Sequence, residues 1–376
     1  MQTKENDVEY HTQPTLSGER VSEGLDGVRR MAHARKRERF TALLHHLTID
    51  LLRESYYALK RGVASGVDVV NWREYEHNYE HNLEERLASL HERVHGGTYR
   101  AHPSRRVYIP KADGRQRPLS IAALEDKIVQ LAVAHILNQI YEADFRDFSY
   151  GFRPGRSRYQ ALDALRVGIT RKRVNWILDA DIRGLFDHMS HEWTMKFMAH
   201  RIADNRILRL IQKWLKAGVS EEGEWSEAKA GTPQGAVISA LLANVYLHYV
   251  FDLWIEVWRQ KAASGDVVVV RYADDLVVGF QHRNDAERFL GEFRERLACF
   301  ALELHPEKTR LIEFSRFARL NRRPRGEGKA ESFTFLGYTH YWRSRGGTVE
   351  KCPNERHALP PSLIRLAADP PLLVRR

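Results

Sequence analysis

Hydrophobic side chains recur at helical spacing through most of this chain, starting near Phe40. Residues 1–38 are polar, lack a sustained period and become basic toward their end, which predicts a mobile basic arm. Gly96-Gly97 ends the second amphipathic stretch, as glycine often does at helix C-termini. The pattern predicts helices over about 40–56, 72–95, 124–141, 191–215 and 285–300, one that begins at 158, and one that runs from the 231–235 loop to about 259.

Short apolar runs separate these helices and are typical of strands. Asp113-Gly114 lies between two extended segments, which is a hairpin signal. The expected strands cover about 105–109, 117–121, 176–182, 267–270, 276–280, 310–314 and 333–338.

Two adjacent carboxylates, Asp274 and Asp275, occur where the two most apolar strand-like runs meet. Carboxylates at the tip of a hydrophobic hairpin are unfavourable unless a cation neutralises them. Mg²⁺ is the usual solution, with carboxylate and phosphate oxygens as ligands, and it points to two-metal phosphoryl transfer on a nucleotide. Asp181, which follows an apolar strand 93 residues earlier (274 − 181), is the natural third carboxylate. On its own, Asp181 fits a helix N-cap equally well.

Charge and composition narrow the class of partner. The chain has 376 residues, 43% of them hydrophobic, a formal net charge of +10 and a pI of about 9.5. Such a balance favours nucleic acid, then acidic membrane surfaces, although a merely soluble basic protein also fits. Two cysteines, Cys299 and Cys352, support neither a disulfide framework nor a cysteine-rich zinc site. With no apolar run near ~18 residues and no signal-peptide pattern, we expect no membrane association and a cytoplasmic location, in a nucleoid or ribonucleoprotein.

The order of the motifs resembles that of a reverse transcriptase, most closely the type encoded by group II introns. The resemblance covers roughly residues 40 to 342. Its pieces follow the family's order: 109–114 with Arg117-Pro118, Gly151 to Ser157, Asp181 to Asp187, Gly231 to Gly235, Tyr272 to Asp275, Pro306 to Thr309 and Phe335 to Tyr338. A lone Tyr-x-Asp-Asp is weak, whereas seven blocks in order are specific.

This resemblance implies an α+β fold: a right-hand polymerase with fingers and an antiparallel palm sheet flanked by helices, preceded by a helical N-terminal extension. The domains it implies are an arm (1–38), the extension (39–100), fingers (101–178), palm (179–342) and a short tail (343–376). The implied activity is RNA-directed DNA synthesis on an RNA template with a DNA primer, in association with group II intron RNA.

The resemblance also assigns roles to residues. Asp181 and Asp274 would hold two Mg²⁺ ions together with the Ile182 carbonyl, and Asp275 would lie beside them in a weaker role. The implied dNTP contacts are Lys111 and Arg117 at the triphosphate, Phe186 under the sugar as a barrier to a 2′-hydroxyl, Gln234 near the templating pair and Lys308 at the pyrophosphate. The implied nucleic-acid contacts are Arg153, Arg156 and Tyr272. Without the motifs, each of these basic residues is interpreted as a solvated surface residue, and Phe186 is interpreted as an aromatic residue of the core.

A second motif resembles the metal-binding pattern of zinc proteases. His91-Glu92-Arg93-Val94-His95 fits the zincin pattern, and His77 and His81 have the same spacing. The apolar stripe of this helix would leave His and Glu on its polar face in any case, and the sequence offers no obvious third ligand. We therefore favour an ordinary amphipathic helix.

The chain departs from its family mainly after Tyr338. The 38 remaining residues (376 − 338) are rich in proline and lack a long amphipathic period, which predicts that the helical thumb, or maturase domain, is missing or reduced. We likewise expect no Cys/His-rich endonuclease module. Ser120 and Ala240 replace the Gly and Pro that the family commonly has. Two other interpretations stay open: a maturase remnant that binds intron RNA without polymerising, and a reverse transcriptase of phage defence.

Overall fold

The computed structural model gives a structure for most of the chain. It describes residues 16–62, 64–76, 82–110, 114, 116–221, 223–228, 230–233, 235–315, 318–326, 331–342 and 372–375. The chain forms two compact units, each built from two separate segments. The first unit comprises Met1–Phe145 and Phe186–Tyr246, and the second comprises Arg146–Leu185 and Leu247–Arg376.

The first unit is mainly helical, and helix α5 (Leu124–Tyr141) forms its centre. Most α5 side chains are buried, because the helix is apolar on nearly every side. Helices α1 and α2 pack against it. The other helices of this unit are α1 (Leu16–Ala34), η1 (Leu44–His46), α2 (Ile49–Ala58), α3 (Trp72–Glu76), α4 (Leu83–His95), α8 (His191–Ala199) and α9 (Asn205–Lys216), with α7 (Leu185–His188) and α10 (Ser239–Leu247) at the ends of its second segment.

Two expectations for the N-terminal region are wrong. The arm predicted over 1–38 contains helix α1, whose Leu25, Val28 and Ala32 are buried. The single helix predicted over 72–95 is interrupted, because Asn82 has an extended backbone and begins α4 with a capping box to Glu85. No membrane-spanning helix occurs among the residues that the structure describes.

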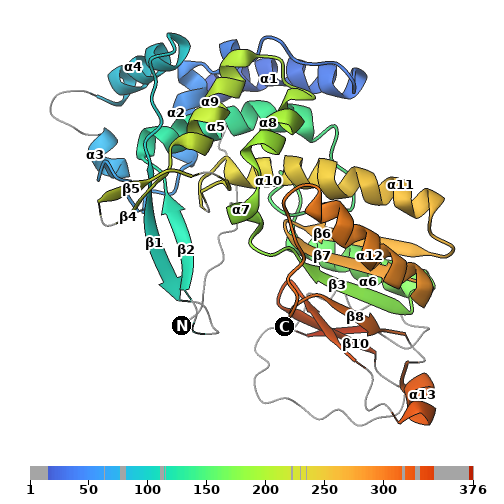
Figure 1. Cartoon of the computed structure of the whole chain (residues 1–376). Helices are drawn as coiled ribbons and strands as arrows, with labels where there is room; N and C mark the ends of the chain where they lie inside the picture. Colours follow the sequence, from blue (N-terminus) through green and yellow to red (C-terminus); the bar gives the residue numbers. More distant parts are fainter. Residues whose placement is uncertain are drawn as a thin grey trace. The chain divides into compact units, whose positions relative to one another are not determined.

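The first unit also holds a small sheet with the strand order β2-β1-β4-β5. Strands β1 (Ser104–Pro110) and β2 (Gln116–Ile121) form the expected antiparallel hairpin, which projects as a long ribbon in Figure 1. Strand β4 (Val219–Glu221) pairs with β1 in parallel and with β5 (Glu224–Ser226) in an antiparallel hairpin. These two short strands were not predicted.

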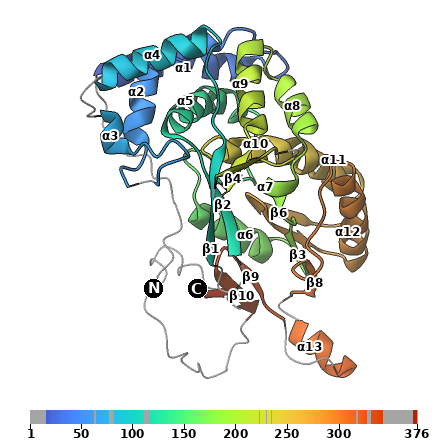
Figure 2. The same cartoon turned by 60° about the vertical axis from the view of Figure 1, so that its left-hand side comes forward.

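The second unit is built on a sheet with the strand order β6-β7-β3-β8, drawn in Figures 1 and 2. Its strands are β3 (Trp176–Asp181), β6 (Val267–Tyr272), β7 (Asp275–Phe280) and β8 (Arg310–Glu313). Ile177, Val270 and Val277 pack against α6 (Arg158–Arg171) on one face. Phe280, on the other face, contacts the aromatic side chains of α11 (Leu253–Lys261) and α12 (Arg283–Ala298). The sheet is therefore covered by helices on both faces.

A second sheet in this unit has the order β11-β10-β9 and contributes to the same core. Its strands are β9 (Phe333–Phe335), β10 (Tyr338–Trp342) and β11 (Leu372–Arg375). The remaining elements are η2 (His248–Asp252), α13 (Ala318–Arg322) and η3 (Arg323–Arg325). The tail predicted over 343–376 lies outside the described residues except for β11, so the prediction about the thumb stays a prediction.

His340 is the least expected member of this core. The ring stacks on Phe333 with a centroid separation of 4.8 Å, and the side chain is 0% exposed. Neither ring nitrogen has a hydrogen-bond partner among the described residues. Burial disfavours the charged imidazolium and lowers the pKa of His340 to about 4 from 6.5.

We expect His340 to make the protein sensitive to acid. Because the folded state has the lower pKa, the unfolded state binds more protons between about pH 6.5 and 4, and stability is lost as the pH falls through this window. The free energy of unfolding should fall by up to about 3 kcal/mol more in wild type than in His340→Phe. Urea unfolding at pH 7 and pH 4 measures this difference. The exposed His33→Gln should keep the wild-type pH slope, and equal slopes for His340→Phe and wild type would contradict the expectation.

Candidate active site

The register of β3 and β7 places two predicted site residues directly opposite each other. Asp181 pairs with Asp275 across the antiparallel ladder, and Asp179 pairs with Val277. Side chains alternate along strands, so Asp179, Asp181 and Asp275 share one face of the sheet. Like charges that face each other across strands are destabilising. The fold thus concentrates negative charge at one end of the sheet.

Asp274 lies in the two-residue connection between β6 and β7. Tyr272 pairs with Asp275 at the end of this hairpin, and Ala273 has a left-handed backbone with φ of 56°. Non-glycine residues rarely adopt this conformation, so the turn depends on support from its surroundings. We call residues 272–275 the catalytic turn, after the role that the resemblance implies for Asp274 and Asp275. Tyr272 is half-buried, and alternation places it on the same face as Asp275.

The carboxylates perturb one another. The pKa of Asp275 is raised to about 7, first by desolvation and then by the charges of Asp274, Asp181 and Asp179. Desolvation likewise raises the pKa of Asp179. Asp275 keeps an exposed surface at the turn, which screens part of this repulsion. Such a cluster favours any group that brings positive charge.

Two cations already neutralise part of the cluster. The Lys308 ammonium forms an ion pair with Asp181, and Arg310 donates a hydrogen bond of 3.3 Å to Asp179. Sequence reasoning identified Lys308 but missed Asp179 and Arg310. The signal for Asp179 was its spacing, because two residues separated by one position in a strand share a face. Among the described residues, no group of three or more His, Cys, Asp or Glu is arranged to hold a metal ion as it stands.

Ile182 is buried just beyond β3, where it forms an isolated antiparallel bridge with Leu304. The hydrogen bonds of this bridge join the Arg183 N–H to the Glu303 carbonyl (2.9 Å) and the His305 N–H to the Asp181 carbonyl (2.7 Å). The bridge does not use the carbonyl of Ile182 itself.

The basic loop at residues 146–156 lies beside β6. The Tyr150 N–H donates to the Arg271 carbonyl, and a Cβ on Gly151 would lie 2.3 Å from the Ala273 nitrogen. Arg153 is only 7% exposed and donates to the carbonyls of Arg146 and Ser149. Arg153 therefore shapes the loop from within.

The more accessible residues of this loop are aromatic and basic. Arg156 pairs with Asp147 and lies over the Tyr150 ring. Phe152 is 54% exposed and has a left-handed backbone with φ of 56°. Of the two predicted arginines, Arg156 is the one placed where a phosphate could reach it.

In the first unit, Phe186 lies in the single turn α7 and is linked to the 231–235 loop. Its carbonyl accepts a 2.7 Å hydrogen bond from the Thr232 N–H, and the Gly231 N–H donates to the Met189 carbonyl. Gly231 has φ of 82°, and a Cβ there would lie 2.6 Å from the Phe186 carbonyl oxygen. Only glycine fits this close approach.

The far side of the same loop contacts the β1–β2 hairpin. A Cβ on Gly235 would lie 3.0 Å from the carbonyl oxygen of Ser120, which is on β2. Arg117 is exposed on the same strand. Lys111 and Gln234 lie outside the described residues. The flanking residues of the loop nevertheless join Phe186 to the strand that carries Arg117.

The zincin-like helix is α4. His91 and His95 have ring centroids 4.1 Å apart, and His95 Nε2 lies 2.9 Å from the Leu47 carbonyl oxygen. Leu83, Leu87, Leu90 and Val94 form the buried face of α4, as the amphipathic interpretation requires. His77 and His81 lie outside the described residues.

Comparison with known proteins identifies the family. A family model described as reverse transcriptase (RNA-dependent DNA polymerase) matches residues 109–340, more than half of the chain. This chain belongs to the reverse transcriptase family. The match confirms the α+β polymerase fold expected from the motif order, and it includes Asp181, Asp274 and Asp275.

Similar sequences agree with the group II intron resemblance. Protein YkfC of Escherichia coli (strain K12) is 37% identical over 223 residues, covering 51% of this reverse transcriptase chain and 58% of YkfC. Group II intron-encoded protein LtrA of Lactococcus lactis subsp. cremoris is 35% identical over 212 residues, covering 56% of this chain and 35% of LtrA. The chain thus spans less than two thirds of the length of either relative.

A solved structure also resembles the chain. Telomerase from Candida albicans, in complex with the TWJ fragment of telomeric RNA, has a TM-score of 0.48 and 15% sequence identity. The alignment covers 64% of this chain and 44% of the telomerase chain.

Removing one charge from the carboxylate cluster of this reverse transcriptase should stabilise the metal-free protein. We expect Asp275→Asn in EDTA to raise the free energy of unfolding by about 1 kcal/mol, with a Tm increase of a few degrees, because it relieves repulsion at a partly screened site. Thermal unfolding measured by circular dichroism tests this. Asp266→Asn is the control: a hydrogen bond from the Arg173 N–H and the Lys172 ammonium lower the pKa of Asp266, so its loss should lower Tm. A lower Tm for Asp275→Asn in EDTA would contradict the repulsion argument.

Gly231→Ala should destabilise the first unit, because its left-handed backbone and the Phe186 carbonyl leave no room for a methyl group. We expect a loss of about 1–3 kcal/mol in urea unfolding. Gly27→Ala is the matched control, since Gly27 lies within α1 with nothing near its Cβ position, and alanine there should stabilise by about 1 kcal/mol. Equal effects of the two substitutions would rule out this account of the loop.

Proposed function

We propose that this protein is a reverse transcriptase of group II intron type, which adds dNTPs to a primer 3′-hydroxyl on an RNA template. The observation that carries the proposal is the register that sets Asp181 opposite Asp275, with Asp274 in the adjoining turn. Family membership supports reverse transcription in general, and the intron-encoded relatives support the group II type.

The donor set fits Mg²⁺, a hard cation that prefers oxygen ligands. Desolvation and then repulsion by the neighbouring carboxylates raise the pKa of Asp275, and a divalent ion would relieve that repulsion. We propose that Asp181, Asp274 and the Ile182 carbonyl hold two ions, with Asp275 beside them. Bound Mg²⁺ would activate the primer hydroxyl and stabilise charge on the triphosphate.

Lys308 has a different part in this proposal. Its ammonium neutralises Asp181 when no metal is bound, and it would exchange that partner for the pyrophosphate when the carboxylate binds Mg²⁺. Asp179 and Arg310 form a neighbouring ion pair on the same face of the sheet. We propose that this pair keeps the carboxylate of Asp179 away from the metal ligands.

The first unit would supply the nucleotide contacts. We propose that Phe186 excludes a 2′-hydroxyl, Gln234 lies against the templating pair, and Lys111 and Arg117 neutralise the triphosphate. The hydrogen bond from the Thr232 N–H to the Phe186 carbonyl supports this assignment, because it joins a residue close to Gln234 in the chain to the turn that carries Phe186.

RNA is the proposed template partner, with a DNA primer and group II intron RNA as further partners. The net charge of +10 favours such polyanions. Arg156 and Tyr272 are the proposed contacts in the second unit. Arg153 would act through the shape of its loop.

Primer extension with Mg²⁺, dNTPs and an RNA template tests the proposal. We expect extension by wild type and a loss of at least about 1,000-fold in Asp274→Ala, because the carboxylate belongs to the proposed metal site. Asp266→Ala, at the opposite end of β6, should extend primers normally. RNA binding of equal affinity in wild type and Asp274→Ala, without extension by either, would exclude polymerase activity and favour a maturase that only binds RNA.

A further inference from the structure

Arg271 is a fully buried arginine next to the catalytic turn. It lies on β6 and is 0% exposed. Register and alternation place its side chain on the face of the sheet opposite to Asp181 and Asp275. Arg271 therefore cannot share a metal site with these carboxylates, and its function must be exerted from behind the turn.

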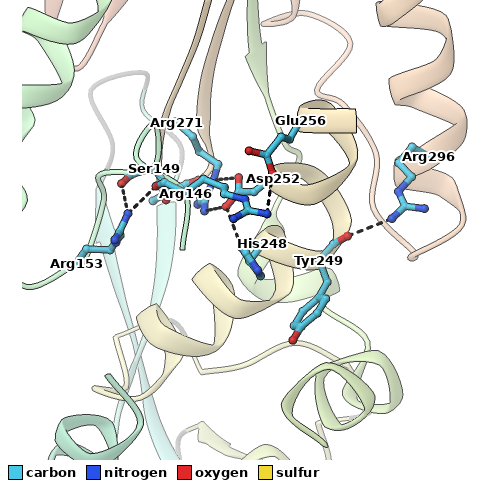
Figure 3. Close-up of polar contacts among 10 residues, drawn as sticks. Arg146, Ser149, Arg153, His248, Tyr249, Asp252, Glu256, Arg271 and Arg296 are labelled. Atoms are coloured by element: carbon cyan, nitrogen blue, oxygen red, sulfur yellow. Dashed lines mark hydrogen bonds and ion pairs between the residues drawn. The ribbon is translucent and has the colours of Figure 1, made fainter. Parts of the chain in front are cut away.

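The guanidinium group binds the carboxylate of Asp252, as Figure 3 shows, and also a backbone carbonyl. Nε and one terminal nitrogen donate to the carboxylate of Asp252 over 2.8 and 2.6 Å. The other terminal nitrogen donates to the carbonyl of Ala273 over 3.2 Å. That carbonyl belongs to the peptide unit between Ala273 and Asp274. The Ala273 carbonyl and the Asp274 nitrogen share one planar peptide unit. A hydrogen bond that holds this oxygen therefore also fixes the orientation of the backbone at Asp274.

Asp252 is itself held in place. It is 0% exposed and ends η2, a π-helical turn in a helix that continues as α11. His248 Nδ1 lies 3.8 Å from its second carboxylate oxygen. Burial opposes the charge of Asp252, but Arg271 and His248 outweigh it and keep the pKa of this carboxyl below its usual range. π-Helical turns are rare and frequently mark functional positions.

The backbone of Arg271 also forms hydrogen bonds with the basic loop at residues 146–156. Its N–H donates to the Phe148 carbonyl and its carbonyl accepts from the Tyr150 N–H, both over 2.8 Å. Gly151 then passes so close to the Ala273 nitrogen that no side chain would fit between them. The catalytic turn is thus held by the loop backbone and by the Arg271 guanidinium.

Stability alone does not account for this arrangement. A buried ion pair can often be replaced by apolar side chains without loss of stability. Arginine offers what an apolar pair does not, namely a rigid fork that binds a carboxylate with one edge and a carbonyl with the remaining nitrogen. The left-handed backbone of Ala273 is the kind of strained conformation that requires such support.

We propose that Arg271 is a positioning residue: held by Asp252, its guanidinium fixes the Ala273 carbonyl and thereby the orientation of Asp274. The claim about the turn is independent of any activity. Its consequence for DNA synthesis rests on the proposed function.

The test replaces the ion pair by apolar side chains, in the double variant Arg271→Met/Asp252→Leu. Hydrogen–deuterium exchange of the peptide that covers residues 270–277 is the first readout. We expect Tm to stay near that of wild type while exchange in this peptide becomes about tenfold faster, because the turn loses a bond that the apolar pair cannot replace. Unchanged exchange in a folded double variant overturns the proposal.

A matched control removes another ion pair from the same sheet. Glu313→Leu/Arg325→Met changes a carboxylate of β8 and its arginine partner, and Glu313 lies opposite Trp176, at the other end of β3 from Asp181. Exchange of the 270–277 peptide should stay at the wild-type rate in this control. Faster exchange there as well would mean that any charge removed from the sheet loosens the turn, and it would overturn the specific assignment to Arg271.

Arg271→Lys is the second variant, in case the double variant fails to fold. Lysine keeps the charge beside Asp252 but lacks the fork, so the turn should again exchange faster. If the exchange rate equals that of wild type, the positioning claim is wrong.

Primer extension adds a second, separate readout. In Arg271→Lys we expect kcat to fall about 100-fold with KM for dNTP nearly unchanged, because a small misplacement of Asp274 affects the chemical step. If total activity falls only as much as the folded fraction falls, so that kcat per folded molecule is normal, the positioning claim is wrong. If wild type extends no primer while exchange responds as expected, the proposed function fails and the positioning of the turn stands.

Discussion

The register between β3 and β7 is the constraint on which the second unit depends. It sets Asp181 against Asp275 and simultaneously aligns Ile177 and Val277 with the core beneath α6. A slip of one residue would turn Asp181 to the opposite face, against the aromatic side chains of α11 and α12, and would take Ile177 out of the core beneath α6. The same pairing therefore secures the core and concentrates the charge. Lys308 and Arg310 neutralise part of that charge locally.

The opposite face of the sheet also carries charged residues, but there the charges are paired. Arg271 and Asp252 are both fully buried, and breaking such a pair from one side typically costs about 3–5 kcal/mol. On the acidic face the carboxylates still repel one another. In the buried pair, Arg271 donates to both oxygens of Asp252 and uses a further nitrogen to bind the Ala273 carbonyl. A strained turn between the two faces can keep its shape while its carboxylates remain available to a cation.

Much of this architecture could be predicted from the sequence, because the longest apolar patterns correspond to real elements. The strands around Asp181 and Asp275 and the long helix α5 are examples. Helix α1 was missed because, among those of its side chains that the structure describes, Leu25, Val28 and Ala32 alone mark a buried face within a polar stretch. Strands β4 and β5 were missed because three-residue strands carry too little period to detect. Neither strand's own sequence specifies that β3 pairs with β7. The order of the motifs was needed to predict that pairing. Burial of Arg153 escaped prediction, since basic residues are usually exposed.

The two interleaved segments of each unit have a consequence for how the chain acquires its structure. Strand β3 emerges from the ribosome long before β7 and β8, the partners on its two edges. The intervening residues 186–246 belong to the first unit, so that unit can be completed while β3 still lacks both neighbours. Pairings of such high sequence separation are slow to form and leave strand edges open to other chains. Synthesis that stops before residue 310 would leave β3 without β8. The order of translation thus keeps both edges of β3 unpaired until β7 and β8 have been made.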